Sequence, residues 1–137
     1  MHLNDAFAAH PGIKVVCLHH EQALAIAAEG YARCNNKPAA VNVTTGPGGL
    51  NTLTGVHGAF VDSLPLIVIS GQVKVQTISS LCDEHLRQLG DQEANIFAAA
   101  QPFVKFIAMP TETCQVANVL KKALFYMNDG RRGPVWL

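Results

Sequence analysis

The sequence predicts an α/β fold in which a parallel sheet is flanked by helices. Three short apolar runs, at residues 13–18, 38–44 and 66–70, are rich in β-branched residues. Each run is apolar on both faces, as is typical of a strand in a covered parallel sheet. Apolar residues at helical spacing separate the runs, at 22–34 and 50–61. Such a strand–helix alternation builds a parallel sheet with right-handed crossovers.

The first half of the chain contains most of these elements. Residues 1–10 have the pattern of the back of a helix, and the first expected strand, 13–18, follows them. The alanine-rich helix expected at 22–34 places Leu24, Ala28 and Tyr31 at helical spacing. The second expected strand then leads through a glycine-rich turn into the helix at 50–61, and the third strand closes this half.

The second half repeats the alternation more loosely. We expect a strand at 103–107, a helix at 112–127 and a further strand beginning at 134–137. The stretch 73–95 mixes charged and polar residues without a sustained period, and irregular segments of this length in compact α/β domains are usually functional or disordered. Because the chain starts inside a helix and stops inside a strand, we expect the domain to be truncated at both ends.

Length and composition limit the possible functions. The chain has 137 residues, which suits a single domain over 1–137. With 49% hydrophobic and 15% charged residues, it either buries much surface internally or covers an apolar face with a partner. Ten Lys and Arg residues balance ten Asp and Glu residues, which argues against binding to nucleic acid.

The sequence gives no indication of a membrane span or a metal site. It contains no apolar run of the ~18–20 residues that a spanning helix needs, so we expect no membrane partner and a cytoplasmic location. The four cysteines form no CxxC pair, which favours reduced thiols. Of the six histidines only His19 and His20 are neighbours, and adjacent residues of a strand point to opposite faces.

Glu21 is the first candidate for a chemical role. It stands where the first expected strand ends and a helix begins, and ligands of open α/β sheets bind at the carboxyl ends of strands. A carboxylate at this point is placed to contact a ligand. The alternative is a glutamate of the first helical turn that is stabilised by the helix dipole alone.

A glycine-rich turn, residues 44–51 with the sequence TTGPGGLN, is the second candidate. It joins a strand to a helix, so its backbone N–H groups face the same edge of the sheet as Glu21. Glycine allows a ligand or another backbone to approach closely. The turn matches neither GxGxxG nor the phosphate-binding P-loop, so a purely packing role stays open. Two weaker candidates are Gly71-Gln72, which could be a simple turn, and the polar segment 86–93, which could be solvated surface.

Five motifs in order carry a family resemblance: HEQ at 20–22, AEGYAR at 28–33, TGPG at 45–48 with Asn51, DSLPL at 62–66 and SGQV at 70–73. The series resembles the N-terminal pyrimidine-binding (PYR) domain of thiamine-diphosphate enzymes of the acetolactate synthase and pyruvate oxidase group. The resemblance covers nearly the whole chain and ends in GRRGPV at 130–135.

The resemblance implies a cofactor site and a reaction. The implied cofactor-binding residues are Glu21, Thr44, Gly46, Pro47, Gly48, Asn51 and Arg131. A glutamate in the position of Glu21 hydrogen-bonds the N1′ nitrogen of the aminopyrimidine and favours the imino tautomer that activates the thiazolium ring. This requires the surroundings to tune the pKa of the glutamate. The reaction implied is decarboxylation of a 2-keto acid and transfer of the resulting acyl carbanion.

The resemblance also implies groups and partners outside the chain. Arg131 matches an arginine that contacts FAD, and Gln92 matches a glutamine that lines the substrate site of the neighbouring subunit. Mg²⁺ is held by a separate pyrophosphate (PP) domain, of which this chain shows no Gly-Asp-Gly motif. Since the family's active site forms between the PYR domain of one subunit and the PP domain of another, we expect a homodimer or homotetramer and no turnover by this chain alone.

One position departs from the acetolactate synthase pattern. These enzymes carry a phenylalanine immediately before the Gln92 position, where this chain has Asp91. The change predicts a related decarboxylase or carboligase whose substrate pocket differs at Asp91.

Two other functions are compatible with the same fold. The first is a non-catalytic binding or regulatory module, which would have no need of Glu21. The second is a dinucleotide-binding domain, which the absence of GxGxxG and of its downstream acidic partner disfavours.

Overall fold

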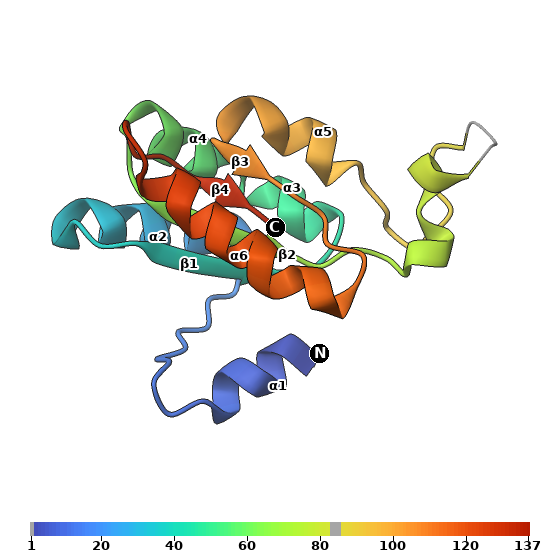
Figure 1. The fold of residues 1–137 in the computed structure, drawn as a ribbon, viewed down its shortest axis with the longest axis horizontal. Coiled ribbons are helices and arrows are strands. Elements are labelled where there is room, and N and C mark those ends of the chain that lie inside the picture. Colours follow the sequence, from blue (N-terminus) through green and yellow to red (C-terminus); the bar gives the residue numbers. More distant parts are fainter. Residues whose placement is uncertain (1, 83–85) are drawn as a thin grey trace.

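The computed structural model of the chain describes residues 2–82 and 86–137, and it has the α/β architecture that the sequence predicts (Figure 1). The strands of the described residues form one sheet of four, in the order β1-β2-β4-β3. Their bounds are β1 Ala39–Val43, β2 Leu66–Ser70, β3 Phe106–Ile107 and β4 Val135–Trp136. All three neighbouring pairs are parallel, as expected for strands joined by helical crossovers.

The expected helices are confirmed, with one divided in two. The helices are α1 His2–Ala9, α2 Glu21–Asn35, α3 Pro47–Asn51, α4 Leu53–Val61, α5 Ile96–Ala100 and α6 Thr113–Asn128. The helix expected at 50–61 is the pair α3 and α4, which meet at Thr52. The buried hydroxyl of Thr52 donates a hydrogen bond to the carbonyl of Gly49 at 2.7 Å, and this bond marks the junction.

The prediction of a strand at 13–18 is wrong. This segment is irregular, and Val15 and Val16 are 50% and 62% exposed. A strand needs a neighbour to pair its backbone groups, and within the described residues β1 pairs only with β2. The segment instead links α1 to α2 as a coil outside the sheet (Figure 1). Apolar, β-branched composition alone therefore does not produce a strand here.

Helices cover the two faces of the sheet. Ile67 and Val135 pack with Ala123 and Met127 of α6. Their strand neighbours Leu66, Val68 and Trp136 point to the other face and pack with α2 and α4. This alternation follows from the period of two in a strand. In Figure 1, α6 crosses in front of the sheet.

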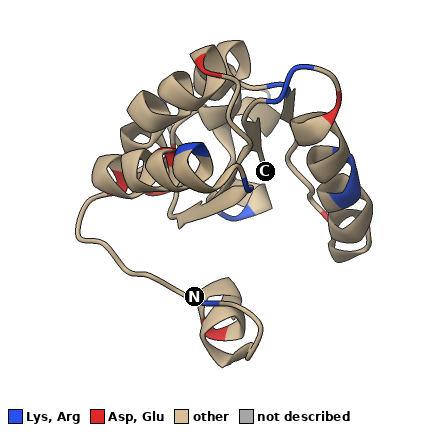
Figure 2. Cartoon of the chain, turned by 90° about the vertical axis from the view of Figure 1, so that its left-hand side faces the viewer, with Lys and Arg blue, Asp and Glu red and all other residues tan. Residues whose placement is uncertain are grey.

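Helix α1 stands apart from this layered body. Figures 1 and 2 show that a single extended coil segment joins it to α2, and none of its residues is buried. Asn42 of β1 donates a side-chain hydrogen bond to the side chain of Asn4 at 2.5 Å. No helix among the described residues is both long and apolar enough to cross a membrane.

The described part of 73–95 is largely irregular, as expected. It contains two short 3₁₀ turns, η1 Val75–Thr77 and η2 Ser79–Leu81, before α5 begins. A third 3₁₀ turn, η3 Gln101–Phe103, then leads toward β3. The long loop projects beyond the carboxyl end of β2, on the side of the glycine-rich turn.

The close packing of α2 on α4 depends on Gly55. A Cβ atom there would lie 2.6 Å from the backbone carbon of Ala25 and 2.8 Å from its Cβ. We therefore expect Gly55→Ala to lower the free energy of unfolding by about 1–3 kcal/mol, because backbone would have to move. Gly30→Ala on α2 is the matched control, since an added Cβ there meets nothing within 4 Å. It should raise stability by about 0.5–1 kcal/mol. Urea denaturation of both variants checks the opposite signs.

Candidate functional site

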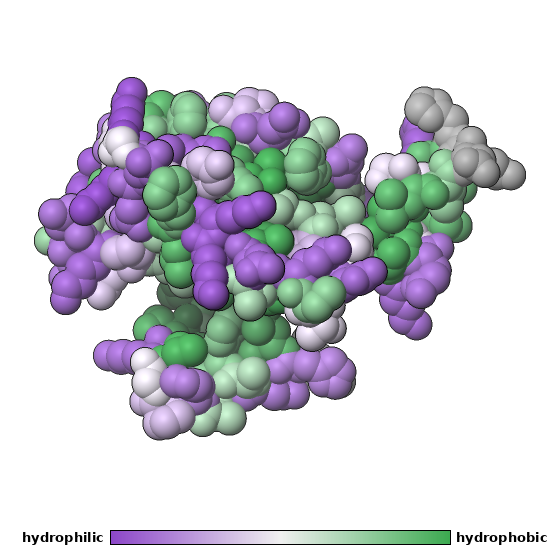
Figure 3. Space-filling view, in the orientation of Figure 1, coloured by the Kyte–Doolittle hydropathy of each residue, from purple (hydrophilic) through white to green (hydrophobic). Residues whose placement is uncertain are grey.

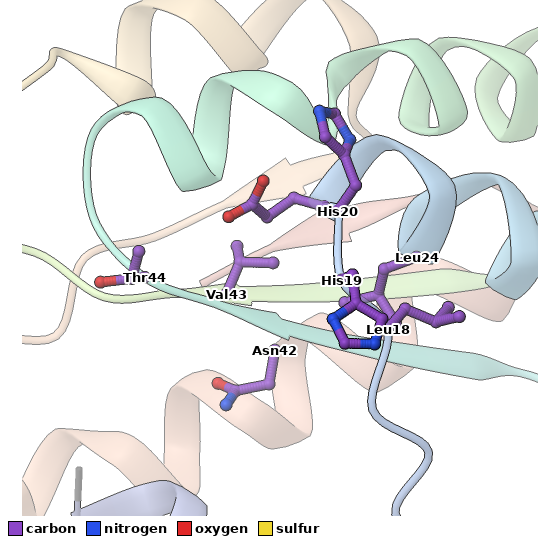
Figure 4. Close-up of a pocket in the computed structure, with 8 residues that line it drawn as sticks. Leu18, His19, His20, Leu24, Asn42, Val43 and Thr44 are labelled. Atoms are coloured by element: carbon purple, nitrogen blue, oxygen red, sulfur yellow. The ribbon is translucent and has the colours of Figure 1, made fainter.

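The candidate residues gather beyond the carboxyl ends of the parallel strands. Thr44 follows β1, Gln72 follows β2, and Glu21 opens α2 at the same edge. A hollow of about 210 Å³ lies beside β1, and Figure 4 shows its lining side chains. The lining is Leu18, His19, His20, Glu21, Leu24, Asn42, Val43 and Thr44. This is the location at which open α/β sheets bind their ligands.

The start of α2 is fixed by two side chains. His20 is the N-cap residue, and its Nδ1 accepts a hydrogen bond from the backbone N–H of Gln22 at 3.1 Å. Gln22 in turn donates from Nε2 to the hydroxyl of Thr54 on α4 at 3.2 Å. An N-cap satisfies one of the backbone donors that a helix start leaves unpaired. These contacts hold the first turn of α2, and with it Glu21, against the body of the domain.

Glu21 is a half-buried carboxylate with a defined partner. Asn51, at the end of α3, donates from Nδ2 to Glu21 Oε2 at 3.1 Å. The hydrogen bond from its own backbone N–H, followed by that from Asn51, holds the pKa of Glu21 below its ordinary value. Partial burial opposes this shift, and nearby His20 adds to it. With the surroundings this chain provides, Glu21 is therefore ionised at neutral pH and acts as a hydrogen-bond acceptor.

Gly48 lets the turn pass close to Thr44 and to this carboxylate. A Cβ atom at Gly48 would lie 2.7 Å from the Thr44 methyl group and 3.6 Å from Glu21 Oε1. At Gly48 the turn therefore brings backbone rather than a side chain toward the Glu21 carboxylate, while the side chain of Asn51 supplies the hydrogen-bond donor. Pro47 occupies the first turn of α3, where its missing N–H costs nothing. We call this arrangement the cradle: the Glu21 carboxylate is an acceptor at one side, and the buried backbone of Gly46 and Gly48 lies at the other.

Gly46 allows the backbone of the long loop, at Gln92, to lie against the glycine-rich turn. Its φ of 56° is in the left-handed region, and an added Cβ would lie only 1.9 Å from the carbonyl oxygen of Gln92. Gln92 itself has a φ of 53°, which is unusual for a residue with a side chain. The structure thus places the backbone of Gln92 against the glycine-rich turn, and both Gln92 and its neighbour Asp91 are exposed.

Gln72 connects three parts of the site, a role that the sequence alone did not reveal. Its Oε1 accepts hydrogen bonds from the hydroxyl of Thr45 and from the N–H of Val73, both at 2.9 Å. Its Nε2 reaches the carbonyl of Ala94 at 3.5 Å. The signal available in the sequence was its position immediately after the third strand, which a simple turn also explains.

Arg131 lies away from the other candidates. It precedes β4, so it belongs to the opposite edge of the sheet from Glu21. Its guanidinium donates from Nε to the Ser63 hydroxyl at 2.6 Å and from Nη2 to the carbonyl of Val61 at 2.8 Å. A second hollow, lined by Phe60, Val61, Lys105, Arg131 and Arg132, opens beside it.

Metal-binding side chains are not clustered in the part of the chain that the structure describes. Across residues 2–82 and 86–137, no group of three or more His, Cys, Asp or Glu side chains is arranged to hold a metal ion. The adjacent His19 and His20 point in different directions (Figure 4).

The contact between Asn51 and Glu21 is directly testable. Asn51→Ala removes a donor that stabilises the ionised carboxylate, so the pKa of Glu21 should rise toward its ordinary value. A carbon-13 NMR titration of the glutamate side chains measures this shift. Asn128→Ala, which removes an amide from the distant helix α6, should leave the pKa of Glu21 unchanged. An unaltered Glu21 titration in the Asn51 variant would show that the contact does not form in solution.

Comparison with known proteins places this site in a family. Residues 1–99 match the family described as thiamine pyrophosphate enzyme, N-terminal TPP binding domain. The chain is 37% identical over 131 residues to the acetolactate synthase large subunit of Haemophilus influenzae, covering 96% of the chain and 22% of that protein.

Other relatives agree. The chain is 37% identical over 131 residues to the acetolactate synthase isozyme 3 large subunit of Escherichia coli, covering 96% of the chain and 21% of that protein. It is 33% identical over 135 residues to the chloroplastic acetolactate synthase of Arabidopsis thaliana, covering 98% of the chain and 19% of that protein. The chain thus spans about a fifth of the length of these relatives. The family match over residues 1–99 includes Glu21, and the chain belongs to the thiamine pyrophosphate enzyme family as an N-terminal TPP-binding domain of acetolactate-synthase-like type.

Proposed function

We propose that this chain binds the aminopyrimidine part of thiamine diphosphate in an enzyme that decarboxylates a 2-keto acid and transfers the acyl carbanion. The observation that carries the proposal is the Glu21 carboxylate, which is held by Asn51 and lines a hollow of about 210 Å³ at the carboxyl end of β1. A ring with nitrogen atoms at its edge needs a hydrogen-bond acceptor, and Glu21 offers one at the hollow.

The residues of the cradle fit the cofactor in distinct ways. Glu21 would hold a proton shared with a ring nitrogen, while Asn51 keeps its carboxylate oriented. Thr44 and the backbone of Gly46 and Gly48 would border the ring. When bound, thiamine diphosphate supplies the electron sink for cleavage of the bond to the carboxylate. The chain itself supplies orientation and the position of one proton.

The lowered pKa of Glu21 is relevant to the partner that we propose. In this chain hydrogen bonds, that from its own backbone N–H first and that from Asn51 second, outweigh partial burial and hold the pKa of Glu21 below its ordinary value. A PP domain of a second subunit that covered the cradle would remove water and raise the pKa of Glu21, which favours sharing of a proton. The same PP domain would hold the diphosphate and Mg²⁺.

Exposed apolar surface supports an assembled protein, which we propose is a homodimer or homotetramer. The lobe formed by η1 and η2 shows apolar side chains at the surface (Figure 3), and Val75 and Leu81 in it are 43% and 58% exposed. This lobe belongs to the same loop as Gln92. A neighbouring subunit that covered it would also enclose the cradle. We further propose a cytoplasmic enzyme, in keeping with the free thiols of all four cysteines.

We propose FAD as a second, structural cofactor at Arg131. The hollow beside Arg131 combines an apolar floor of Phe60 and Val61 with the cations Lys105 and Arg132. An apolar floor with a cationic rim suits a flat ring that carries phosphates. Its place at the opposite edge of the sheet from Glu21 is consistent with a group that takes no part in the carbon–carbon chemistry.

The alternative of a non-catalytic module is not favoured. Such a module has no use for a carboxylate that is oriented by Asn51 and lines a hollow. We therefore propose an enzyme, and we propose that Asp91 and Gln92 determine which acceptor it uses.

Glu21→Gln in the complete enzyme tests the role of the carboxylate. Glutamine keeps the shape and one acceptor but cannot take up the shared proton. Exchange of the C2 proton of bound thiamine diphosphate, followed by NMR, should slow by about 10²–10⁴-fold. Glu112→Gln, which neutralises a carboxylate at the start of α6, should leave exchange at the wild-type rate. Exchange within a few-fold of wild type in Glu21→Gln would exclude this role.

Substitutions of Asp91 test which acceptor substrate the enzyme prefers. A carboxylate beside Gln92 would repel the carboxylate of a second 2-keto acid by on the order of a few kcal/mol in a partly desolvated site. We expect the enzyme to prefer an aldehyde or water as acceptor, and Asp91→Phe to raise acetolactate formation relative to other products. Asp91→Asn removes the negative charge without adding an aromatic ring, so it should give only part of the increase in acetolactate formation. If wild type forms acetolactate efficiently and neither variant changes the product ratio, Asp91 points away from the pocket.

A further inference from the structure

Glu93 receives an unusual number of hydrogen bonds for a loop carboxylate. Its Oε1 accepts from the backbone N–H and the hydroxyl of Ser79, at 2.7 Å and 2.8 Å. Its Oε2 accepts from the N–H groups of Leu89 and Gly90, at 2.9 Å and 3.2 Å. The thiamine chemistry described above makes no use of this carboxylate.

These bonds connect two parts of the loop that regular structure does not hold. Ser79 begins the short turn η2, whereas Leu89 and Gly90 lie in an irregular stretch. Backbone N–H groups in such segments need partners other than a helix or a sheet. One side chain, Glu93, supplies an acceptor to three of them. Its removal would therefore release both parts of the loop together.

The turn next to Glu93 carries Gln92. The backbone N–H of Glu93 donates to the carbonyl of Gly90 at 3.2 Å, which encloses Asp91 and Gln92 in a turn. Gln92 adopts the left-handed φ of 53° in this turn, a conformation that costs free energy in a residue with a side chain. Such a conformation persists only where its surroundings impose it.

Two glycines, Gly90 and Gly46, allow the same turn to pack closely against the rest of the domain. A Cβ atom at Gly90 would lie 2.6 Å from the Val73 side chain, and one at Gly46 would lie 1.9 Å from the Gln92 carbonyl oxygen. The turn is therefore in close contact on two sides. The four bonds to Glu93 tie Leu89 and Gly90 to Ser79, so Glu93 contributes to fixing the backbone of the turn that carries Gln92.

The charge state of Glu93 suits this role. Burial acts to raise the pKa of its carboxyl group, but the bonds from Leu89, Ser79 and Gly90 together outweigh burial and hold the pKa below its ordinary value. The group is thus a carboxylate at neutral pH, with both oxygens available as acceptors.

We propose that Glu93 is a positioning residue that holds the Gly90–Glu93 turn in the conformation that presents Gln92 to the substrate. This rests on the proposed function, in which Gln92 lines the substrate site. Glu93 touches neither cofactor nor substrate and acts through Gln92. It is distinct from Glu21, whose carboxylate is directed at the cradle.

Glu93→Gln in the complete enzyme tests the proposal. The amide turns a donor group toward N–H groups that need an acceptor, so at least one oxygen's bonds are lost. We expect the KM for the 2-keto acid to rise on the order of tenfold, with C2 proton exchange and the affinity for thiamine diphosphate unchanged. Hydrogen exchange at the amides of Ser79, Leu89 and Gly90 should accelerate. A merely structural role would lower the active fraction without raising KM.

Gln92→Ala and the double variant complete the test. If Glu93 acts through Gln92, each single variant raises KM and the double variant raises it no further. A raised KM in Gln92→Ala with an unchanged KM in Glu93→Gln overturns this inference and leaves the proposed function intact. An unchanged KM in both overturns the inference together with the substrate role of Gln92, while Glu21→Gln still tests thiamine binding separately.

Two further variants guard against ambiguity. Should Glu93→Gln fail to fold, Ser79→Ala removes only one hydroxyl donor and should still raise KM and amide exchange, by a smaller factor; unchanged values in that variant would overturn the proposal. Asp129→Asn removes a negative charge from an exposed turn before β4, at the opposite edge of the sheet, and should leave KM at the wild-type value. An equal rise of KM in Asp129→Asn would attribute the effect to net charge and overturn the role of Glu93.

Discussion

The absence of side chains at Gly46 and Gly48 is the constraint on which the rest of the site depends. Three segments from distant parts of the chain meet there: the start of α2, the turn after β1 and the long loop before α5. Gly48 lets the turn lie close to Thr44 and Glu21, and Gly46 admits the backbone of Gln92. Any side chain at either position would separate these segments. Glycine is therefore required here by close approach as well as by conformation.

The body of the domain supports this meeting point through small residues. Alanines on α2 and Gly55 on α4 let the two helices approach closely, so that the first turn of α2 lies near the end of α3. The Asn51–Glu21 bond forms across that junction. Since side chains in a packed core have little freedom to adjust, the separation of the helices sets the geometry of the carboxylate. Packing remote from the site thus contributes to its chemistry.

Much of the fold could be predicted because it depends on local pattern. The β-branched runs that became β1 and β2 and the helical spacing of α2 and α6 are short-range properties. The segment 13–18 has the same composition as those strands and is nevertheless a coil. Strand formation requires a paired neighbour, and pairing is a long-range event that composition does not report. The division between α3 and α4 was hidden for a related reason, since it depends on a bond of the buried Thr52.

The sequence by itself determined the chemical groups of the site. Glu21, the TGPG turn and Asn51 could be identified from motif order, and the parallel sheet placed the first two at one edge. Only the tertiary structure decided that Asn51 orients Glu21, that Gln72 joins the turn to the loop, and that Glu93 holds the turn of Gln92. It also decided that Arg131 lies at the opposite edge. The reason is physical: residue types specify which bonds are possible, whereas the folded backbone selects which donors and acceptors lie within reach of one another.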